Sequence, residues 1–257
     1  MNTFGPMRNS VLVGPAKSMA DQIYDTLKDA IIRREIEPNQ RLLEVEIAGR
    51  FGASRTPVRE AFRRLEQDGV AERLAQGGIR VPQPDTETVQ DLYDLRLILE
   101  VYAIELACER IGAADIAQLK QIRAQAEELL KSDDLSQEFT LNRFHELSSM
   151  FHDSIYSATR SKFLIKVLNN IRAMVLSMRS VSIRLDSIRE VWDEHSRLID
   201  HLERKEKGAA VRLIKQHVFR TAGQVLSFIR AESGGTESAP IPVKPRKRRS
   251  SPKQPLK

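Results

Sequence analysis

The chain has 257 residues, of which 41% are hydrophobic, so it can bury a sizeable core and its length favours two modest domains over one. No apolar run is long enough to cross a membrane and the N-terminus lacks the apolar stretch of a signal peptide, so we expect a cytoplasmic protein. The single cysteine, Cys108, cannot form an internal disulfide, and its apolar helical surroundings indicate a buried structural thiol.

The formal net charge of +6 is distributed unevenly along the chain. Residues 1–84 contain 13 basic and 11 acidic side chains, residues 85–235 contain 21 and 23, and residues 236–257 contain 7 and 1. The excess positive charge therefore lies in a C-terminal segment rich in Pro, Lys, Arg and Ser. We predict a disordered basic tail over 234–257, which either contacts nucleic-acid phosphates without sequence preference or has no fixed role.

The first folded segment follows residues 1–18, which we interpret as a flexible N-terminal arm. Apolar residues recur at helical spacing from Met19 to Arg34, and a turn at 38–40 closes this predicted helix. A second, short helix is predicted from Val45 to Phe51, and Gly52 is a typical C-terminal glycine for it.

A third helix is predicted after Ser54, whose hydroxyl can cap it. Arg55 and Arg59 lie one turn apart near its N-terminus. In a helix-turn-helix the second helix enters the major groove of DNA, where guanidinium groups bind guanine O6 and N7 or grip phosphate. These two arginines are therefore candidate DNA contacts.

Arg63 and Arg64 lie further along the same predicted helix. We interpret both as solvent-exposed charges that pair with Glu60 or Glu66 at helical spacing. Two short strands around a turn at 76–78 are predicted next, with Arg80 on the returning strand.

The run SRTPVREAFRRLEQDGV resembles the signature of the GntR family of bacterial transcription regulators, and residues 19–84 resemble that family's winged helix-turn-helix. The resemblance implies that Arg55 and Arg59 contact operator DNA, that the Thr56 hydroxyl contacts phosphate or base, and that the wing glycine Gly78 approaches the minor groove. Some relatives place an arginine where this chain has Val45, so the resemblance does not imply that base contact here. The predicted DNA-binding set is Ser54, Arg55, Thr56, Arg59, Gly78 and Arg80.

Residues 85–233 change character and contain only amphipathic patterns with a period near 3.6, the first of them capped by Thr86. We predict an all-helical bundle there. All of the chain's histidines fall in its helices: His145, His152, His195, His201 and His217. Imidazoles that converge on one cavity bind divalent transition metals, but sequence spacing alone does not choose among these five.

The segments MFHDSIYSATRSKFL and EHSRLIDHLERKEKGAAVRLIKQHV resemble the FCD domain, the effector-binding domain of the FadR-type branch of the GntR family. The resemblance implies that His152, His195 and His217 bind a divalent transition metal such as Zn, Ni or Mn. The family's fourth ligand is Asp or Asn, and Ser148 takes its place here, so we expect a lower metal affinity or a water ligand. The alternative is a metal-free pocket in which the histidines bind an anionic effector directly.

The FCD pattern also matches YDLRLILEVYAIELA, and it assigns a role to Arg96. An inward-facing Arg96 would clamp the carboxylate of an acidic effector, and the alternative is an ion pair with Glu100 one turn away.

These features predict a mainly α fold, with an N-terminal winged helix-turn-helix followed by an FCD-like helical bundle. The predicted function is transcription regulation by a homodimeric repressor that binds a palindromic operator and a small organic acid, with a hinge near 81–85. A metal-dependent hydrolase using Glu146 or Glu194 and an RNA-binding protein are the alternatives from other classes. We expect no enzyme, because the chain has no HExxH, nucleophile elbow, P-loop or dinucleotide glycine pattern.

Overall fold

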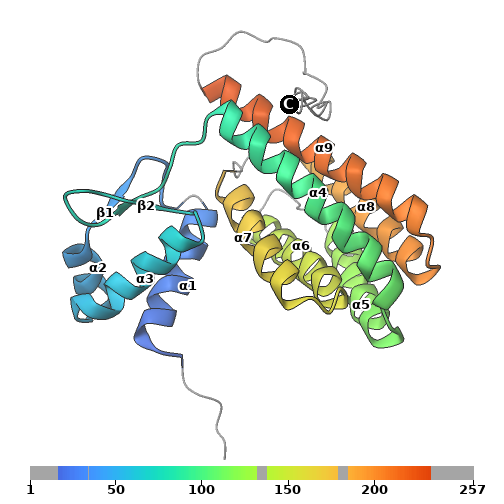
Figure 1. Cartoon of the computed structure of the whole chain (residues 1–257), viewed down its shortest axis with the longest axis horizontal. Helices are drawn as coiled ribbons and strands as arrows, with labels where there is room; N and C mark the ends of the chain where they lie inside the picture. Colours follow the sequence, from blue (N-terminus) through green and yellow to red (C-terminus); the bar gives the residue numbers. More distant parts are fainter. Residues whose placement is uncertain (1–16, 34, 132–137, 179–184, 233–257) are drawn as a thin grey trace, which may run out of the picture. The chain divides into compact units, whose positions relative to one another are not determined.

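The computed structural model describes residues 17–33, 35–131, 138–178 and 185–232, which fall into two compact units (Figure 1). The first unit ends at Pro82 and the second begins at Gln83, whereas the sequence places the boundary after residue 84. Residues 1–16 of the expected arm and all of the expected tail lie outside the described residues.

The described part of the first unit contains the three helices predicted for a helix-turn-helix. They are α1 (Met19–Ile32), α2 (Glu44–Phe51) and α3 (Arg55–Gln67). Ala61, Phe62 and Leu65 on the inner side of α3 are fully buried, and so is Val70 just beyond the helix. These side chains form the centre of the unit's core, and α1 packs against them.

The helix ends of the first unit follow from local sequence. At the start of α1, Ser18 and Asp21 form a capping box, in which each side chain accepts a hydrogen bond of 3.1 Å from the other residue's backbone N–H. Gly52 ends α2 with a φ of +59°, as its glycine predicts. Ser54 occupies the N-cap position of α3, but its side chain forms no capping hydrogen bond, which corrects the expected role of its hydroxyl.

A small antiparallel sheet completes the first unit. Its strands are β1 (Arg41–Leu42), β2 (Glu72–Arg73) and β3 (Ile79–Arg80), in the order β1-β3-β2. The hairpin of β2 and β3 is confirmed as predicted. Strand β1 is not predictable from the sequence, because a strand of two residues has no alternating pattern.

The described part of the second unit is helical throughout. Its helices are α4 (Thr86–Arg110), α5 (Ala113–Leu130), α6 (Glu138–Ala158), α7 (Lys162–Met178), α8 (Leu185–Glu203) and α9 (Lys207–Glu232). The Asp85 side chain accepts a 2.7 Å hydrogen bond from the backbone of Thr88, so Asp85 caps α4 and the expected cap at Thr86 is wrong by one residue.

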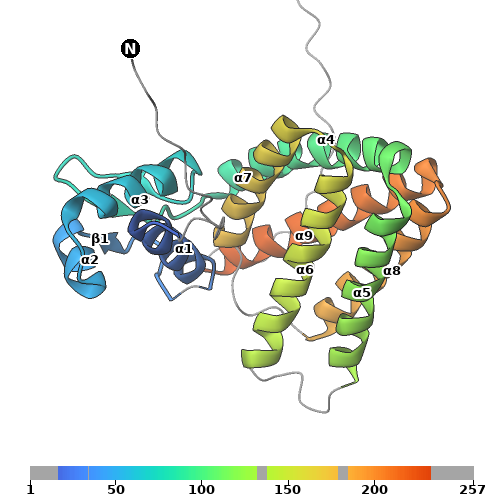
Figure 2. The same cartoon turned by 90° about the horizontal axis from the view of Figure 1, so that it is seen from below.

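The long helices α4 and α9 lie side by side, and α5, α6 and α8 pack around the same core (Figures 1 and 2). This packing brings a part of α6 next to α8 and α9, which follow each other in the chain. Among the described helices, none combines the length with the apolar character needed to span a bilayer.

Candidate DNA-binding surface and metal centre

The N-terminal end of α3 presents exposed polar side chains. Ser54, Arg55 and Thr56 are all exposed, and the first turn of α3 contains no acidic residue. The backbone N–H groups at a helix N-terminus attract anions, and here no Ser54 side chain covers them. The backbone at this end of α3 can therefore bind a phosphate, and the side chains around it can form hydrogen bonds to base edges.

Arg59 lies one turn further along α3 and has a partner that the sequence analysis missed. Its Nε donates a 2.8 Å hydrogen bond to Oε2 of Glu44, the first residue of α2. The Arg59 side chain is 61% exposed, whereas that of Glu44 is only 16% exposed. No pattern within α3 reveals this contact, because it depends on how α2 and α3 cross.

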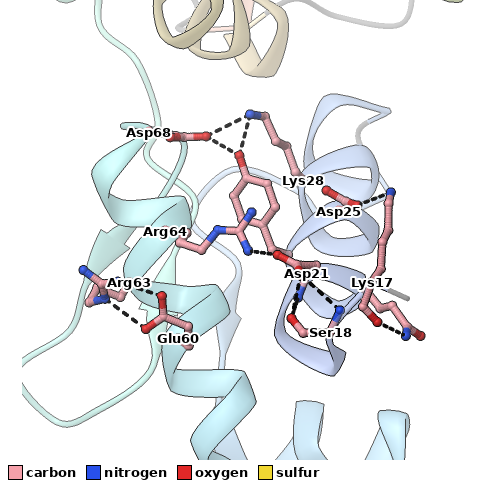
Figure 3. A network of polar contacts seen from close by, with 11 residues as sticks. Lys17, Ser18, Asp21, Asp25, Lys28, Glu60, Arg63, Arg64 and Asp68 are labelled. Atoms are coloured by element: carbon pink, nitrogen blue, oxygen red, sulfur yellow. Dashed lines mark hydrogen bonds and ion pairs between the residues drawn. The ribbon is translucent and has the colours of Figure 1, made fainter. Parts of the chain in front are cut away.

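The two later arginines of α3 differ from each other. Arg63 forms the expected exposed ion pair with Glu60, at 2.6 Å. Arg64 instead turns toward α1, where it pairs with Asp21 at 2.6 Å and lies over the Tyr24 ring, 3.9 Å from its centroid (Figure 3). The expectation that Arg64 pairs with Glu60 or Glu66 is therefore wrong, and its role is to join two helices.

A second set of contacts extends this junction between α1 and α3. Lys28 pairs with Asp68 at 2.8 Å, and the Tyr24 hydroxyl donates a hydrogen bond to the same carboxylate (Figure 3). The carboxylate lies just after the C-terminus of α3 and is partly buried. These contacts fix the orientation of α3, whose outer side carries the candidate DNA contacts.

The wing hairpin contains two glycines with different surroundings. Gly77 is exposed, and nothing lies within 4 Å of the place where its Cβ would be. Gly78 is buried, and a Cβ there would lie 2.4 Å from the backbone oxygen of Leu42. Glycine at 78 is thus explained by close packing on β1, while Gly77 is the glycine open to a partner. Arg80 on β3 is paired with Glu72 at 2.7 Å.

In the second unit, three of the five histidines converge. His152 on α6, His195 on α8 and His217 on α9 are 5%, 1% and 5% exposed, and each offers a ring nitrogen within 4.8 Å of the other two. His201 is not among them, because its Nδ1 lies 2.6 Å from Oε2 of Glu206. The packing of the helices therefore brings together three particular histidines, which sequence spacing alone does not identify.

The surroundings of the cluster favour the neutral form of His152 and His217 and hold the ring plane of His195. Burial and neighbouring positive charges, Arg96 among them, lower the pKa of His152 well below its ordinary value. Burial also lowers the pKa of His217. The Phe151 ring stacks on His195 with 3.9 Å between centroids. Neutral imidazoles in fixed positions are the form in which histidine binds metals.

Glu194, which the sequence suggests only as a residue of the alternative hydrolase, lies beside the histidine cluster. Burial alone would raise the pKa of this carboxyl, but hydrogen bonds from His217 and Arg220 lower it to about 2. His217 Nδ1 lies 2.7 Å from the carboxylate, which can only accept, so Nδ1 carries the proton and Nε2 keeps the lone pair. A carboxylate that fixes a histidine tautomer in this way is a common partner of metal-binding imidazoles.

Arg96 on α4 faces the interior and is 5% exposed. Its Nε donates a 3.2 Å hydrogen bond to Glu100, whose Oε1 also accepts a 2.6 Å hydrogen bond from Tyr156. Of the two interpretations of Arg96, the ion pair with Glu100 is present. The same oxygen of Glu100 lies 4.0 Å from His152 Nδ1, so this pair borders the histidine cluster.

The cluster fits a transition metal by its donor chemistry. Three buried imidazoles are suitable ligands for Zn, Ni or Mn, and three protein ligands leave coordination positions open. Ser148, one turn before His152, is half-buried and supplies no carboxylate. Among the described residues, the group that could hold an ion contains only the three histidines.

Comparison with known proteins assigns a family domain to each of the two units. Residues 19–81 match the profile of the gntR family of bacterial regulatory proteins, and residues 91–220 match the FCD domain. The HTH-type transcriptional regulator YdhC of Bacillus subtilis is 30% identical over 198 residues, which cover 77% of this chain and 84% of that protein. The chain belongs to the GntR family of bacterial regulatory proteins. The GntR helix-turn-helix binds operator DNA and FCD domains bind effectors, so this chain is a transcription regulator and not an enzyme.

Other similar proteins are also transcriptional regulators. The Nta operon transcriptional regulator of Aminobacter aminovorans is 28% identical over 75% of this chain and 88% of that protein. The gluconate operon transcriptional repressor of Bacillus subtilis is 27% identical over 75% of this chain and 78% of that protein. The solved structure of McbR/YncC from E. coli superposes with a TM-score of 0.69 at 20% identity, covering 85% of this chain and all of that one, and supports the GntR fold.

Proposed function

We propose that the chain is a repressor whose operator affinity is controlled by a small carboxylate bound at a divalent transition metal in the helical unit. The observation that carries this proposal is the buried convergence of His152, His195 and His217. The repressor role is favoured because transcriptional repressors, one of them of the gluconate operon, are among the similar proteins.

Two ion pairs, Arg96 with Glu100 and Arg220 with Glu194, border the proposed effector site. A metal ion held by the three imidazoles would supply a Lewis acid for carboxylate oxygens. Glu100 is already engaged by Arg96, and Glu194 by Arg220, so neither carboxylate is free to neutralise the ion. An anionic effector therefore compensates the charge, and the remaining N–H groups of Arg96 can donate to a second oxygen.

The DNA site follows from α3. Arg55, Thr56 and Arg59 are the side chains best placed to read base edges in the major groove, and Ser54 with the helix N-terminus receives a phosphate. The wing, with exposed Gly77 and with Arg80, contacts the neighbouring backbone or minor groove, whereas the expected contact of Gly78 is not proposed because Gly78 is buried against β1.

A second copy of the chain is the proposed partner of the helical unit. Large apolar side chains are exposed on α4 and on α7, two helices that pack against each other: Leu95, Ile98, Tyr102, Phe163 and Val167. Exposed Asp91 lies one turn before Leu95 on α4, and exposed Lys166 lies beside Val167 on α7. In a twofold arrangement α4 of each copy meets α7 of the other, which joins opposite charges and covers both apolar faces. Such a dimer presents two α3 helices to a palindromic operator.

Control of DNA binding follows from linkage. A carboxylate that binds one arrangement of the two units more tightly than another shifts their equilibrium, and operator DNA changes effector affinity by the same factor. The chain between the units, near 81–85, is where we place the hinge.

The test combines metal content with operator affinity. Purified chain is stripped with a chelator and loaded with Zn²⁺, Ni²⁺ or Mn²⁺, and its affinity for an operator selected from genomic fragments is titrated with mono-, di- and tricarboxylates. We expect one metal ion per chain and a carboxylate that changes operator affinity by about 5- to 150-fold only in the loaded form. If the carboxylate changes operator affinity equally in the stripped form, no metal is needed, and the anion binds the histidines and Arg96 directly.

His217→Ala should abolish metal retention and the carboxylate response while the helical signal in circular dichroism stays. His201→Ala is the matched control, because His201 lies outside the cluster. A response that is equal in wild type and His217→Ala would contradict the proposed site.

A further inference from the structure

We propose that Glu44 is a positioning residue for operator specificity, acting by holding the guanidinium of Arg59 in its base-reading orientation. The inference rests on the proposed role of Arg59 in reading a base. Glu44 opens α2, where the positive end of the helix dipole favours a carboxylate, and the Glu44 side chain is largely covered. The carboxylate is thus a fixed point beside the recognition helix.

The contact leaves the reading atoms of Arg59 available. Its Nε–H donates to Glu44 at 2.8 Å, and the two terminal Nη groups keep their four N–H donors. Two parallel N–H bonds from these nitrogens are the geometry that recognises guanine O6 and N7. Because a long side chain loses rotamer freedom on binding, holding Arg59 in advance reduces that loss.

The stability of the ion pair itself does not explain why Glu44 contacts Arg59. Arg59 is 61% exposed, and ion pairs at such exposure add little to the stability of a folded protein. A negative charge next to the DNA-binding surface repels the phosphates of every sequence, whereas only a site with a correctly placed guanine gains the oriented Arg59. Glu44 therefore weakens binding to all DNA and improves discrimination between sites.

The chain offers a matched control for this idea. Glu60 is also a carboxylate that pairs with an arginine of α3, Arg63, at 2.6 Å. Glu60→Gln removes the same charge from the same domain but leaves the Arg59 contact intact. Glu44→Gln and Glu60→Gln therefore separate the positioning of Arg59 from a general change in charge.

The experiment measures the affinity of each full-length variant for the selected operator and for a random duplex of equal length, at several salt concentrations. For Glu44→Gln we expect tighter binding to random DNA and a loss of at least about fivefold in the ratio of operator to random affinity, the lower end of what one base contact contributes. For Glu60→Gln we expect both affinities to rise together and the ratio to stay unchanged. Thermal unfolding confirms that both variants are folded.

The dependence on Arg59 is tested in the Arg59→Ala background. There, Glu44→Gln should leave the ratio unchanged, because no guanidinium remains to be positioned. Equal ratios for Glu44→Gln and wild type, or a loss of ratio that persists without Arg59, would overturn the inference and leave the proposed function standing. If Arg59→Ala itself leaves the ratio unchanged, both the base contact and the positioning role are wrong.

Discussion

At the residue scale, Gly78 shows how one side-chain-free position allows the wing to form. Its φ of +84° is in the left-handed region, and its Cα lies against the Leu42 carbonyl of the neighbouring strand. Any side chain there would meet both backbone strain and a steric overlap, so the close approach of β1 and β3 depends on glycine.

We expect Gly78→Ala to lower the free energy of unfolding of the first unit by about 2–4 kcal/mol, from backbone strain and overpacking together. Gly77→Ala is the control, because φ there is +91° but nothing lies within 4 Å of the new Cβ. It should cost only the backbone part, about 1–2 kcal/mol. Denaturation followed by circular dichroism compares the two, and equal losses would rule out the overlap with Leu42.

At the histidine cluster, a single carboxylate, Glu194, holds the ring of His217. Glu194→Gln keeps an oxygen that can accept from His217 and Arg220 but removes the negative charge that fixes the imidazole. We expect metal affinity to fall by about 10- to 100-fold, which is typical for the loss of such an outer partner. Competition with a metal chelator measures the change. Glu190→Gln, at an exposed position one turn earlier on α8, should leave the affinity unaltered.

At the scale of secondary-structure elements, the junction of α1 and α3 depends on Arg64. This guanidinium pairs with Asp21, 43 positions earlier in the chain, and covers the Tyr24 ring, so it joins α3 to α1. Arg63, its neighbour, forms a contact within α3 only.

We expect Arg64→Ala to lower the free energy of unfolding by about 1–2 kcal/mol through loss of the cation–π contact and the ion pair. Arg63→Ala should have a much smaller effect on the free energy of unfolding, because its pair with Glu60 is exposed and lies within one helix. Thermal unfolding of the two variants measures the difference. An equal loss of stability for Arg63→Ala and Arg64→Ala would show that the contacts of Arg64 with α1 do not stabilise the unit.

The same elements show what can be predicted from sequence and what cannot. Helices with clear periodicity, such as α3 and α9, and local signals such as Gly52 are predictable because their causes lie within a few residues. Strand β1 and the partners of Arg59 and Arg64 depend on how distant segments cross, which spacing does not encode. The choice of His152, His195 and His217 came from resemblance to the FCD domain, because no local pattern distinguishes them from the other two histidines.

At the scale of the whole molecule, the proposed dimer depends on a few exposed apolar side chains. Ile98 is 67% exposed and Phe163 is 86% exposed, on helices that pack together. Burial of large apolar groups at the centre of an interface commonly contributes most of its binding energy. Two copies joined in this way would bind two half-sites at once, so we expect operator affinity to depend on the oligomeric state.

We expect Ile98→Glu to raise the dimer dissociation constant by at least about 30-fold, the equivalent of about 2 kcal/mol, because a twofold interface contains the substituted residue twice. Sedimentation or light scattering over a range of concentrations measures it. Gln118→Glu, which adds the same charge at an exposed position of α5, should stay dimeric. A monomeric wild type, or an unchanged Ile98→Glu dimer, would remove this surface from the assembly.

The position of Trp192 has an optical consequence. It is the chain's single tryptophan, and its ring lies edge-on to His195 with 5.0 Å between centroids. Its fluorescence therefore originates beside the histidine cluster and nowhere else in the chain. An ion or an acid that enters the cluster alters the surroundings of this indole, whereas a dye on the DNA reports the other unit. The protein thus contains its own label for following occupancy of one site in real time while binding at the other is observed at a second wavelength.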